Sequence, residues 1–102
     1  MKIKAKLKNG VVSVKAMAKH KMWTYDIAKK KTGNRNDANF ITHINASVND
    51  KVVFDASTSQ FLSKNPIFKF KFKADGFKKG DKIVMTWVDL KGNTKTSKSK
   101  IK

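Results

Sequence analysis

Phenylalanine and lysine alternate through the segment Ile67–Lys73, and this alternation constrains the fold more than any other feature of the sequence. Successive side chains of a β-strand point to opposite faces, so a two-residue period places the phenylalanines on one face and the lysines on the other. An α-helix would instead mix the two kinds of residue around its circumference. The segment is therefore predicted to be a strand with one packed face and one solvated face.

The same two-residue period recurs along most of the chain and predicts about seven strands. Asn9–Gly10 is a strong hairpin signal between the first two strands. The number of strands and the spacing of the turns are typical of an immunoglobulin-like antiparallel β-sandwich, with essentially no helix. The expected strands are Lys2–Lys8, Val11–Ala18, Phe40–Val48, Lys51–Ala56, Ile67–Lys73, Asp81–Asp89 and Thr94–Lys102.

The pattern within these strands predicts their places in the sheets. Asp81–Asp89 is apolar on both faces, which favours a central strand, whereas the polar Thr94–Lys102 suits a sheet edge. Phe70 and Trp87 are predicted core residues. Three further side chains are expected to face inward from one strand, namely Val52, Phe54 and Ala56.

Two segments lack alternation. From Met22 to Asn39 the pattern is lost, and Lys29–Asp37 is predicted to be a polar loop rich in turn-forming residues. This connection is longer than most, so it is predicted to be either functional or mobile. Thr58–Asn65 is predicted to be a second irregular segment, and Pro66 precedes the next strand.

The charge of the chain is strongly positive. The 102 residues fit one domain, residues 1–102, and carry 24 basic and 7 acidic side chains, giving a net charge of +17. Such a surface attracts polyanions, but 23 of the basic residues are lysine, and arginine is the usual choice for paired contacts with phosphate. We therefore predict a solvated lysine surface and no nucleic-acid partner, and no apolar run is long enough for a membrane span.

The sequence offers few groups for catalysis. It contains no cysteine, which excludes a thiol nucleophile, a disulfide and a thiolate metal site. None of its seven acidic residues, all Asp, is paired in sequence with a nucleophile or a second acid–base group. The chain is therefore predicted not to be an enzyme and to need no cofactor.

Two other functions stay open as alternatives. Met17, His20 and Met22 could bind copper, because thioether and imidazole ligands suit Cu(I), with His43 joining them across the fold. No further ligand lies at a telling spacing, so packing and turn roles are favoured for these residues. The second alternative is a basic nucleic-acid-binding β domain, although the alternation places Phe and Lys on opposite faces.

Several motifs resemble the SoxZ family, in order and along nearly the whole chain. This sequence departs from the family where Lys21 and Asp37 replace its usual prolines and Asn39 replaces a frequent histidine. The motifs that carry the resemblance are Lys4–Lys8, Met17–Met22, Lys31–Gly33 followed by Phe40–Ile41, Ser63–Pro66 leading into Phe68–Phe72, Gly80–Asp81, Thr86–Asp89 and Gly92.

The resemblance implies a function for the chain. It implies a β-sandwich that pairs with a SoxY-type subunit, which holds sulfur intermediates on a cysteine of its C-terminal arm during thiosulfate oxidation. The Z subunit is expected to be non-catalytic and to meet the other sulfur-oxidation enzymes through this complex. It is expected in the periplasm, exported together with a signal-bearing partner, because no signal peptide is recognisable in the sequence.

The partner interface is predicted at His20, Met22, Lys64, Asn65 and Pro66. Met22 borders the unpatterned segment, where an exposed methionine would make adaptable contacts. The segment Ser63–Pro66 resembles the family motif more closely than turn chemistry alone requires. The competing interpretation is that His20 and Asn65 cap turns and hydrogen-bond to backbone groups.

Overall fold

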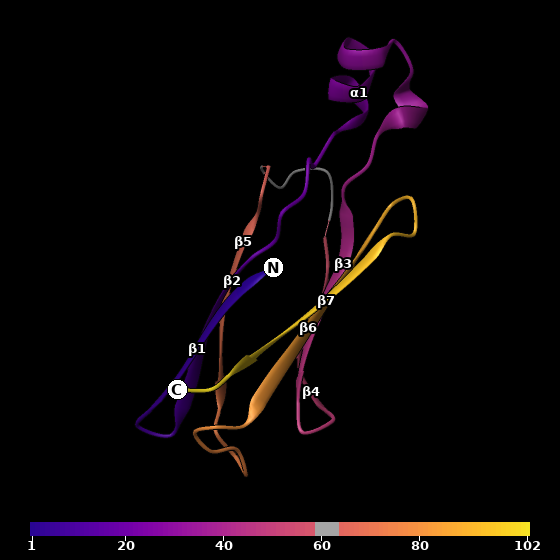
Figure 1. The fold of residues 1–102 in the computed structure, drawn as a ribbon. Coiled ribbons are helices and arrows are strands. Elements are labelled where there is room, and N and C mark those ends of the chain that lie inside the picture. The colour runs from indigo at the N-terminus through magenta and orange to yellow at the C-terminus, as the bar shows by residue number, and fades with distance from the viewer. Residues whose placement is uncertain (59–63) are drawn as a thin grey trace.

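The computed structural model, which describes residues 1–58 and 64–102, is an antiparallel β-sandwich (Figure 1). One sheet has the strand order β1-β2-β5 and the other has the order β4-β3-β6-β7. The predicted fold class is therefore confirmed, with β6 inside its sheet and β7 at an edge. The described strands are β1 (Lys2–Lys8), β2 (Val11–Met17), β3 (Ile41–Val48), β4 (Lys51–Ser57), β5 (Ile67–Lys73), β6 (Lys82–Asp89) and β7 (Thr94–Lys100).

Alternating side chains from both sheets fill the core, as the two-residue period predicts. Val12 and Val14 of β2 are buried against Ile83 and Met85 of the facing sheet, and removing this apolar surface from water drives the sheets together. Trp87 is 8% exposed, which confirms its predicted place in the core.

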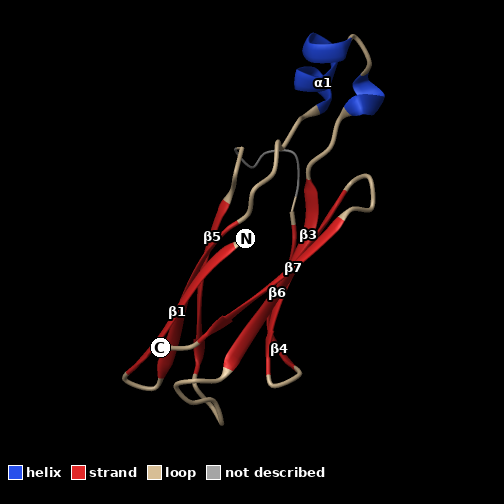
Figure 2. Cartoon of the chain, in the orientation of Figure 1, coloured by secondary structure: helices blue, strands red, loops and turns tan. Residues whose placement is uncertain are grey.

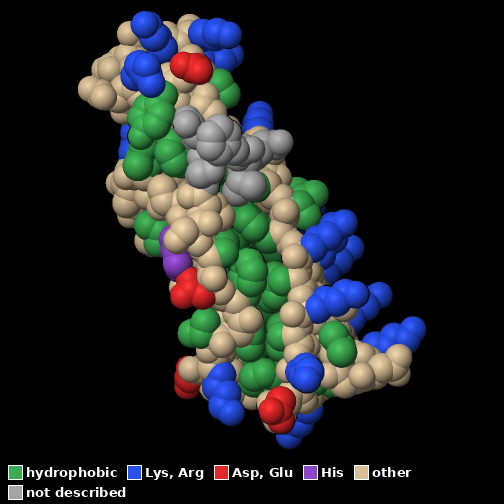
Figure 3. Space-filling model, turned by 180° about the vertical axis from the view of Figure 1, so that it is seen from behind, with side chains coloured by type: hydrophobic (Ala, Val, Ile, Leu, Met, Phe, Trp, Pro, Cys, Tyr) green, Lys and Arg blue, Asp and Glu red, His purple; other side chains and the backbone are tan. Residues whose placement is uncertain are grey.

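Phe70 lies at the margin of the core and not in its centre. It is half-buried, and its ring stacks on Phe54 with centroids 4.3 Å apart. β4 and β5 are the edge strands of their two sheets, so this stack bridges an open margin of the sandwich. Figure 3 shows the margin as a stripe of hydrophobic side chains along the molecule.

A β-bulge overturns the prediction that Val52 faces inward. Ala46 pairs with Phe54 while the next residue, Ser47, pairs with Val52, so Val53 is an extra residue in β4. The extra residue shifts the alternation by one position, because side chains have a period of two. Val52 is therefore 66% exposed, while Val53 and Phe54 are half-buried.

The predictions of essentially no helix and of a loop at 29–37 are wrong. The chain forms α1 (Tyr25–Thr32) and a 3₁₀ turn at Arg35–Asp37, and α1 stands beyond one end of the sandwich (Figure 2). Caps define α1: the hydroxyl of Thr24 accepts from the Ile27 N–H at 3.1 Å, and Gly33 ends the helix with φ of 80°. Among the described residues no helix is long and apolar enough to cross a membrane.

The last residues of the chain join the two sheets along the margin opposite the phenylalanine stack. Ile101 forms a parallel bridge with Ala5. Lys102 donates its N–H to the Ala5 carbonyl at 2.9 Å, and its own carbonyl accepts from the Leu7 N–H at 2.7 Å. We call these contacts the terminal clasp.

Candidate functional site

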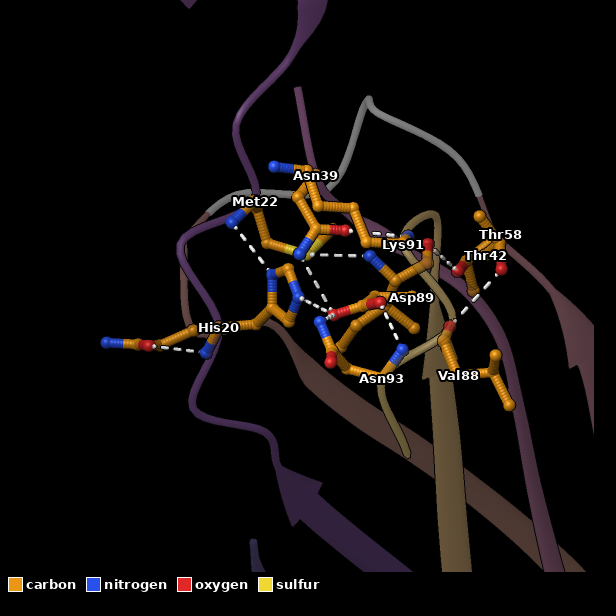
Figure 4. A network of polar contacts seen from close by, with 11 residues as sticks. His20, Met22, Asn39, Thr42, Thr58, Val88, Asp89, Lys91 and Asn93 are labelled. Atoms are coloured by element: carbon orange, nitrogen blue, oxygen red, sulfur yellow. Dashed lines mark hydrogen bonds and ion pairs between the residues drawn. The ribbon is translucent and has the colours of Figure 1, made fainter. Parts of the chain in front are cut away.

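His20 lies just after β2, at the end of the sandwich nearest α1, and both of its ring nitrogens have partners (Figure 4). Nδ1 accepts from the Met22 N–H at 3.0 Å, which leaves the ring proton on Nε2. Nε2 then donates to Asp89 Oδ2 at 3.1 Å. The ring also meets Trp87 edge-on, with centroids 5.1 Å apart, and the His20 side chain is 7% exposed.

Asp89 ends β6 and is the centre of this polar network. Besides His20, it accepts from the side chain of Asn39 at 3.0 Å and from the backbone and side-chain N–H groups of Asn93 at 2.8 and 3.2 Å. Burial by itself raises the pKa of Asp89, but the hydrogen bonds from His20, Asn39 and Asn93 together outweigh it and hold the pKa below its ordinary value. The carboxylate thus stays charged and ties three segments together.

Asn65, which precedes β5 in the same sheet as β2, binds the segment of His20. Its side-chain oxygen accepts from the His20 N–H at 3.0 Å, and its own N–H donates to the His20 carbonyl at 3.0 Å. Nearby, the Pro66 carbonyl accepts from the Ala18 N–H at 3.0 Å. His20 and Asn65 thus do hydrogen-bond to backbone groups at this end of the sandwich, and their predicted contact with a partner stays a prediction.

Met22 does not present an exposed side chain, so the premise of its predicted contact role is wrong. It is 2% exposed, and its sulfur accepts from the Ile41 N–H at 3.4 Å. Its φ is 51°, a strained value for a large residue, and the His20 ring holds the backbone there through the Met22 N–H. Of the other predicted interface residues, Lys64 is exposed, Asn65 is half-buried and Pro66 is buried. Whether this end binds a partner stays a prediction.

Of the residues weighed for a copper site, Met22 lies beside His20, but His43 does not join them. Both nitrogens of His20 and the sulfur of Met22 already take part in hydrogen bonds. His43 lies on the outer face of the other sheet, where it pairs with Asp55. Within the described ranges there is no group of three or more His, Cys, Asp or Glu side chains that could hold a metal ion.

A hollow of about 440 Å³ lies beside this network, between the end of the sandwich and the α1 region. Lys19, Lys21 and Lys91 contribute to its walls, so the hollow is positively charged apart from Asp37. Lys21 also lies 4.9 Å from the ring centre of Trp23. A hollow of this kind can accept a polar or anionic group of a partner molecule.

The sequence pattern only weakly indicates the hydrogen-bond network around Asp89. Asp89 ends an apolar strand just before Gly92 and Asn93, which indicates a turn and nothing more. Its bond to His20 spans 69 positions of the chain. No local pattern reports such a contact.

A family model described as "SoxZ: Sulphur oxidation protein SoxZ" matches residues 1–100 of the chain. No curated protein matches the chain.

Proposed function

The chain belongs to the SoxZ family of sulphur oxidation proteins, and from this premise we propose that it is the non-catalytic subunit of a sulfur-carrier complex. Membership of the family assigns it to sulfur oxidation. The proposal adds the role of the chain in that process. The chain pairs with a SoxY-type subunit, and the other enzymes of thiosulfate oxidation act on the sulfur intermediate that this pair carries.

The absence of cysteine from the sequence carries this proposal. A covalent sulfur carrier on a protein needs a thiolate, because the thiolate is the nucleophile that forms the bond to sulfur. The 102 residues contain none, so a member of this family with this sequence depends on a partner for the carrier thiol. A SoxY-type subunit with a cysteine on its C-terminal arm supplies that group in the proposed complex.

The proposed interface lies at the end of the sandwich that holds the His20 network. Lys64 is exposed there, and Lys19, Lys21 and Lys91 surround the adjoining hollow. In this proposal the buried residues, Met22 and Pro66, shape the surface from inside instead of touching the partner. The paired subunits act in the periplasm, and the chain reaches it together with its signal-bearing partner.

Co-expression with a SoxY-type subunit tests the pairing. A tag on that subunit should retain this chain in stoichiometric amount, and the purified chain alone should consume no thiosulfate. Separate elution of two folded proteins would refute the proposal, as would thiosulfate turnover by the chain alone.

A matched pair of variants tests the interface separately. Lys64→Glu should weaken pairing by about tenfold, since a charge reversed inside an interface meets the wrong partner groups. Lys98→Glu carries the same charge change on the outer face of β7 and should leave the affinity unchanged. If both variants melt like the parent and both pair normally, the complex stands but its interface lies elsewhere.

A further inference from the structure

The outer face of the sheet β1-β2-β5 is covered with lysine. Its outward positions contain no acidic residue on any of the three strands, which the structure describes in full. Every one of these lysines is exposed. We call this surface the lysine face, and it consists of Lys2, Lys4, Lys6, Lys8, Lys15, Lys69, Lys71 and Lys73.

The strand register places three of these charges directly beside one another. Lys4 is opposite Lys15, and Lys15 is opposite Lys69 on the next strand. Neighbouring strands lie about 4.8 Å apart, and like charges at directly opposite positions destabilise a sheet. Both ion pairs in the described part of the chain are formed by histidine, so no lysine is neutralised within it. The approach of acidic groups from outside therefore stabilises the lysine face.

One end of the lysine face adds an apolar contact. Met17 is opposite Ile67 on the outward side, and Ile67 is 53% exposed. These two side chains line a small hollow of about 190 Å³ together with Lys2, Lys4 and Lys15. A wider groove of about 400 Å³ continues along the face, between the side chains of Lys4, Lys6, Lys69 and Lys71. The aliphatic stems of lysine can cover apolar groups in such a groove while their charged ends stay in water.

We propose that the lysine face is a docking surface for an acidic patch on a protein partner, with the spot formed by Met17 and Ile67 receiving an apolar side chain of that partner. Charge complementarity selects the acidic patch. A protein is favoured over nucleic acid because protein interfaces combine apolar contacts with a polar rim. The lysine face has no arginine and no aromatic ring, which are the groups that pair with phosphates and stack on bases. This inference depends only on the residues of the lysine face and does not require the SoxY-type pairing proposed above.

Two triple variants of the full chain test the proposal. Lys4→Gln/Lys15→Gln/Lys69→Gln removes the central row of the lysine face. Lys82→Gln/Lys98→Gln/Lys100→Gln removes three lysines from the outer face of the other sheet, so both variants have the same net charge. The probes are an oligoglutamate peptide and a peptide of equal charge that ends in two leucines, titrated by fluorescence anisotropy at low and high salt. Double-stranded DNA and phosphatidylglycerol vesicles are tested in parallel.

The lysine-face variant should bind both peptides about tenfold more weakly, because it loses three of the charges that attract an acidic peptide. The control variant should stay within about threefold of the parent, and added salt should reduce the difference. Ile67→Ser should weaken binding of the leucine-ended peptide alone. Thermal melts confirm that each variant is folded.

Three results overturn the proposal. Equal losses in the two triple variants would mean that the charge acts diffusely and that no docking face exists. A loss confined to double-stranded DNA or to phosphatidylglycerol vesicles would assign the lysine face to that polyanion instead of to a protein. An Ile67→Ser variant with unchanged affinity for the leucine-ended peptide would remove the apolar contact on which the assignment to a protein depends.

Discussion

The His20–Asp89 network and the lysine face use charge in opposite ways. Asp89 is a single buried carboxylate with hydrogen-bond donors from His20, Asn39 and Asn93. The lysine face holds eight exposed ammonium groups, of which those of Lys4, Lys15 and Lys69 lie directly opposite one another, and no acidic residue lies on the same face. In the first region, hydrogen bonds to the charged group stabilise the fold. In the second region, repulsion between exposed like charges destabilises it. Substitutions in the two regions should therefore change the free energy of unfolding in opposite directions.

Asp89→Asn should have the largest effect. The substitution removes the negative charge and turns an amide toward groups that are already donors, so the free energy of unfolding should fall by about 2–3 kcal/mol. For a domain of this size, such a loss lowers Tm by about 10 °C or more. Asp55→Asn is the control, since Asp55 is exposed and, among the residues that the structure describes, pairs only with His43. The change in its free energy of unfolding should be below about 1 kcal/mol. Similar melting curves for the two variants would contradict the structural role given to Asp89.

Acid should reduce the difference between Asp89→Asn and the parent. The folded-state pKa of Asp89 lies below its ordinary value of 3.8. The stability that it contributes is therefore complete above the unfolded-state pKa and is lost as the pH falls through the folded-state pKa. Urea unfolding between pH 7 and pH 3 measures this. The parent should lose stability below about pH 4 more steeply than the variant, and a gap that stays constant down to pH 3 would refute the assignment.

Lys15→Gln should have the smallest effect, with the opposite sign. Lys15 faces Lys4 on one side and Lys69 on the other, so neutralising it removes two unfavourable pairs. The free energy of unfolding should rise by about 0.2–1 kcal/mol at low ionic strength and by less at high salt. Lys71→Gln, opposite the uncharged Ser13, should change stability little. If Lys15→Gln destabilises the chain, the row is not a region of repulsion.

The two-residue period predicts the strands well, because it is a local property of the sequence. The predicted strand Ile67–Lys73 has the bounds of β5, and the other strands agree to within two residues. The sequence pattern does not predict α1, since eight residues make barely two turns and the helix buries only Ala28. The capping residues Thr24 and Gly33 were the available signal. The alternation of apolar and polar residues does not predict the bulge that exposes Val52, because the bulge depends on the pairing of β4 with β3.

The candidate site was harder to predict than the fold. The predicted residues His20 and Asn65 do lie together, joined by two hydrogen bonds although 45 positions separate them. The burial of Met22 and the partners of Asp89 could not be predicted, because both depend on which distant segments meet at this end of the sandwich. Long-range packing sets these contacts, and local residue patterns do not encode it.

The terminal clasp has a consequence for the order of folding. It joins residues from nearly opposite ends of the sequence, and beside it the Ser99 hydroxyl donates to the Ile3 carbonyl at 3.1 Å across 96 positions. Closing so long a loop costs more conformational entropy than forming the hairpin of β1 and β2. We expect that hairpin to form early and the clasp to close late, as in other β-rich chains whose rates are limited by distant contacts. Until it closes, the margin along β1 stays open, so an intermediate trapped in refolding should show unprotected amides at Leu7 and Lys102.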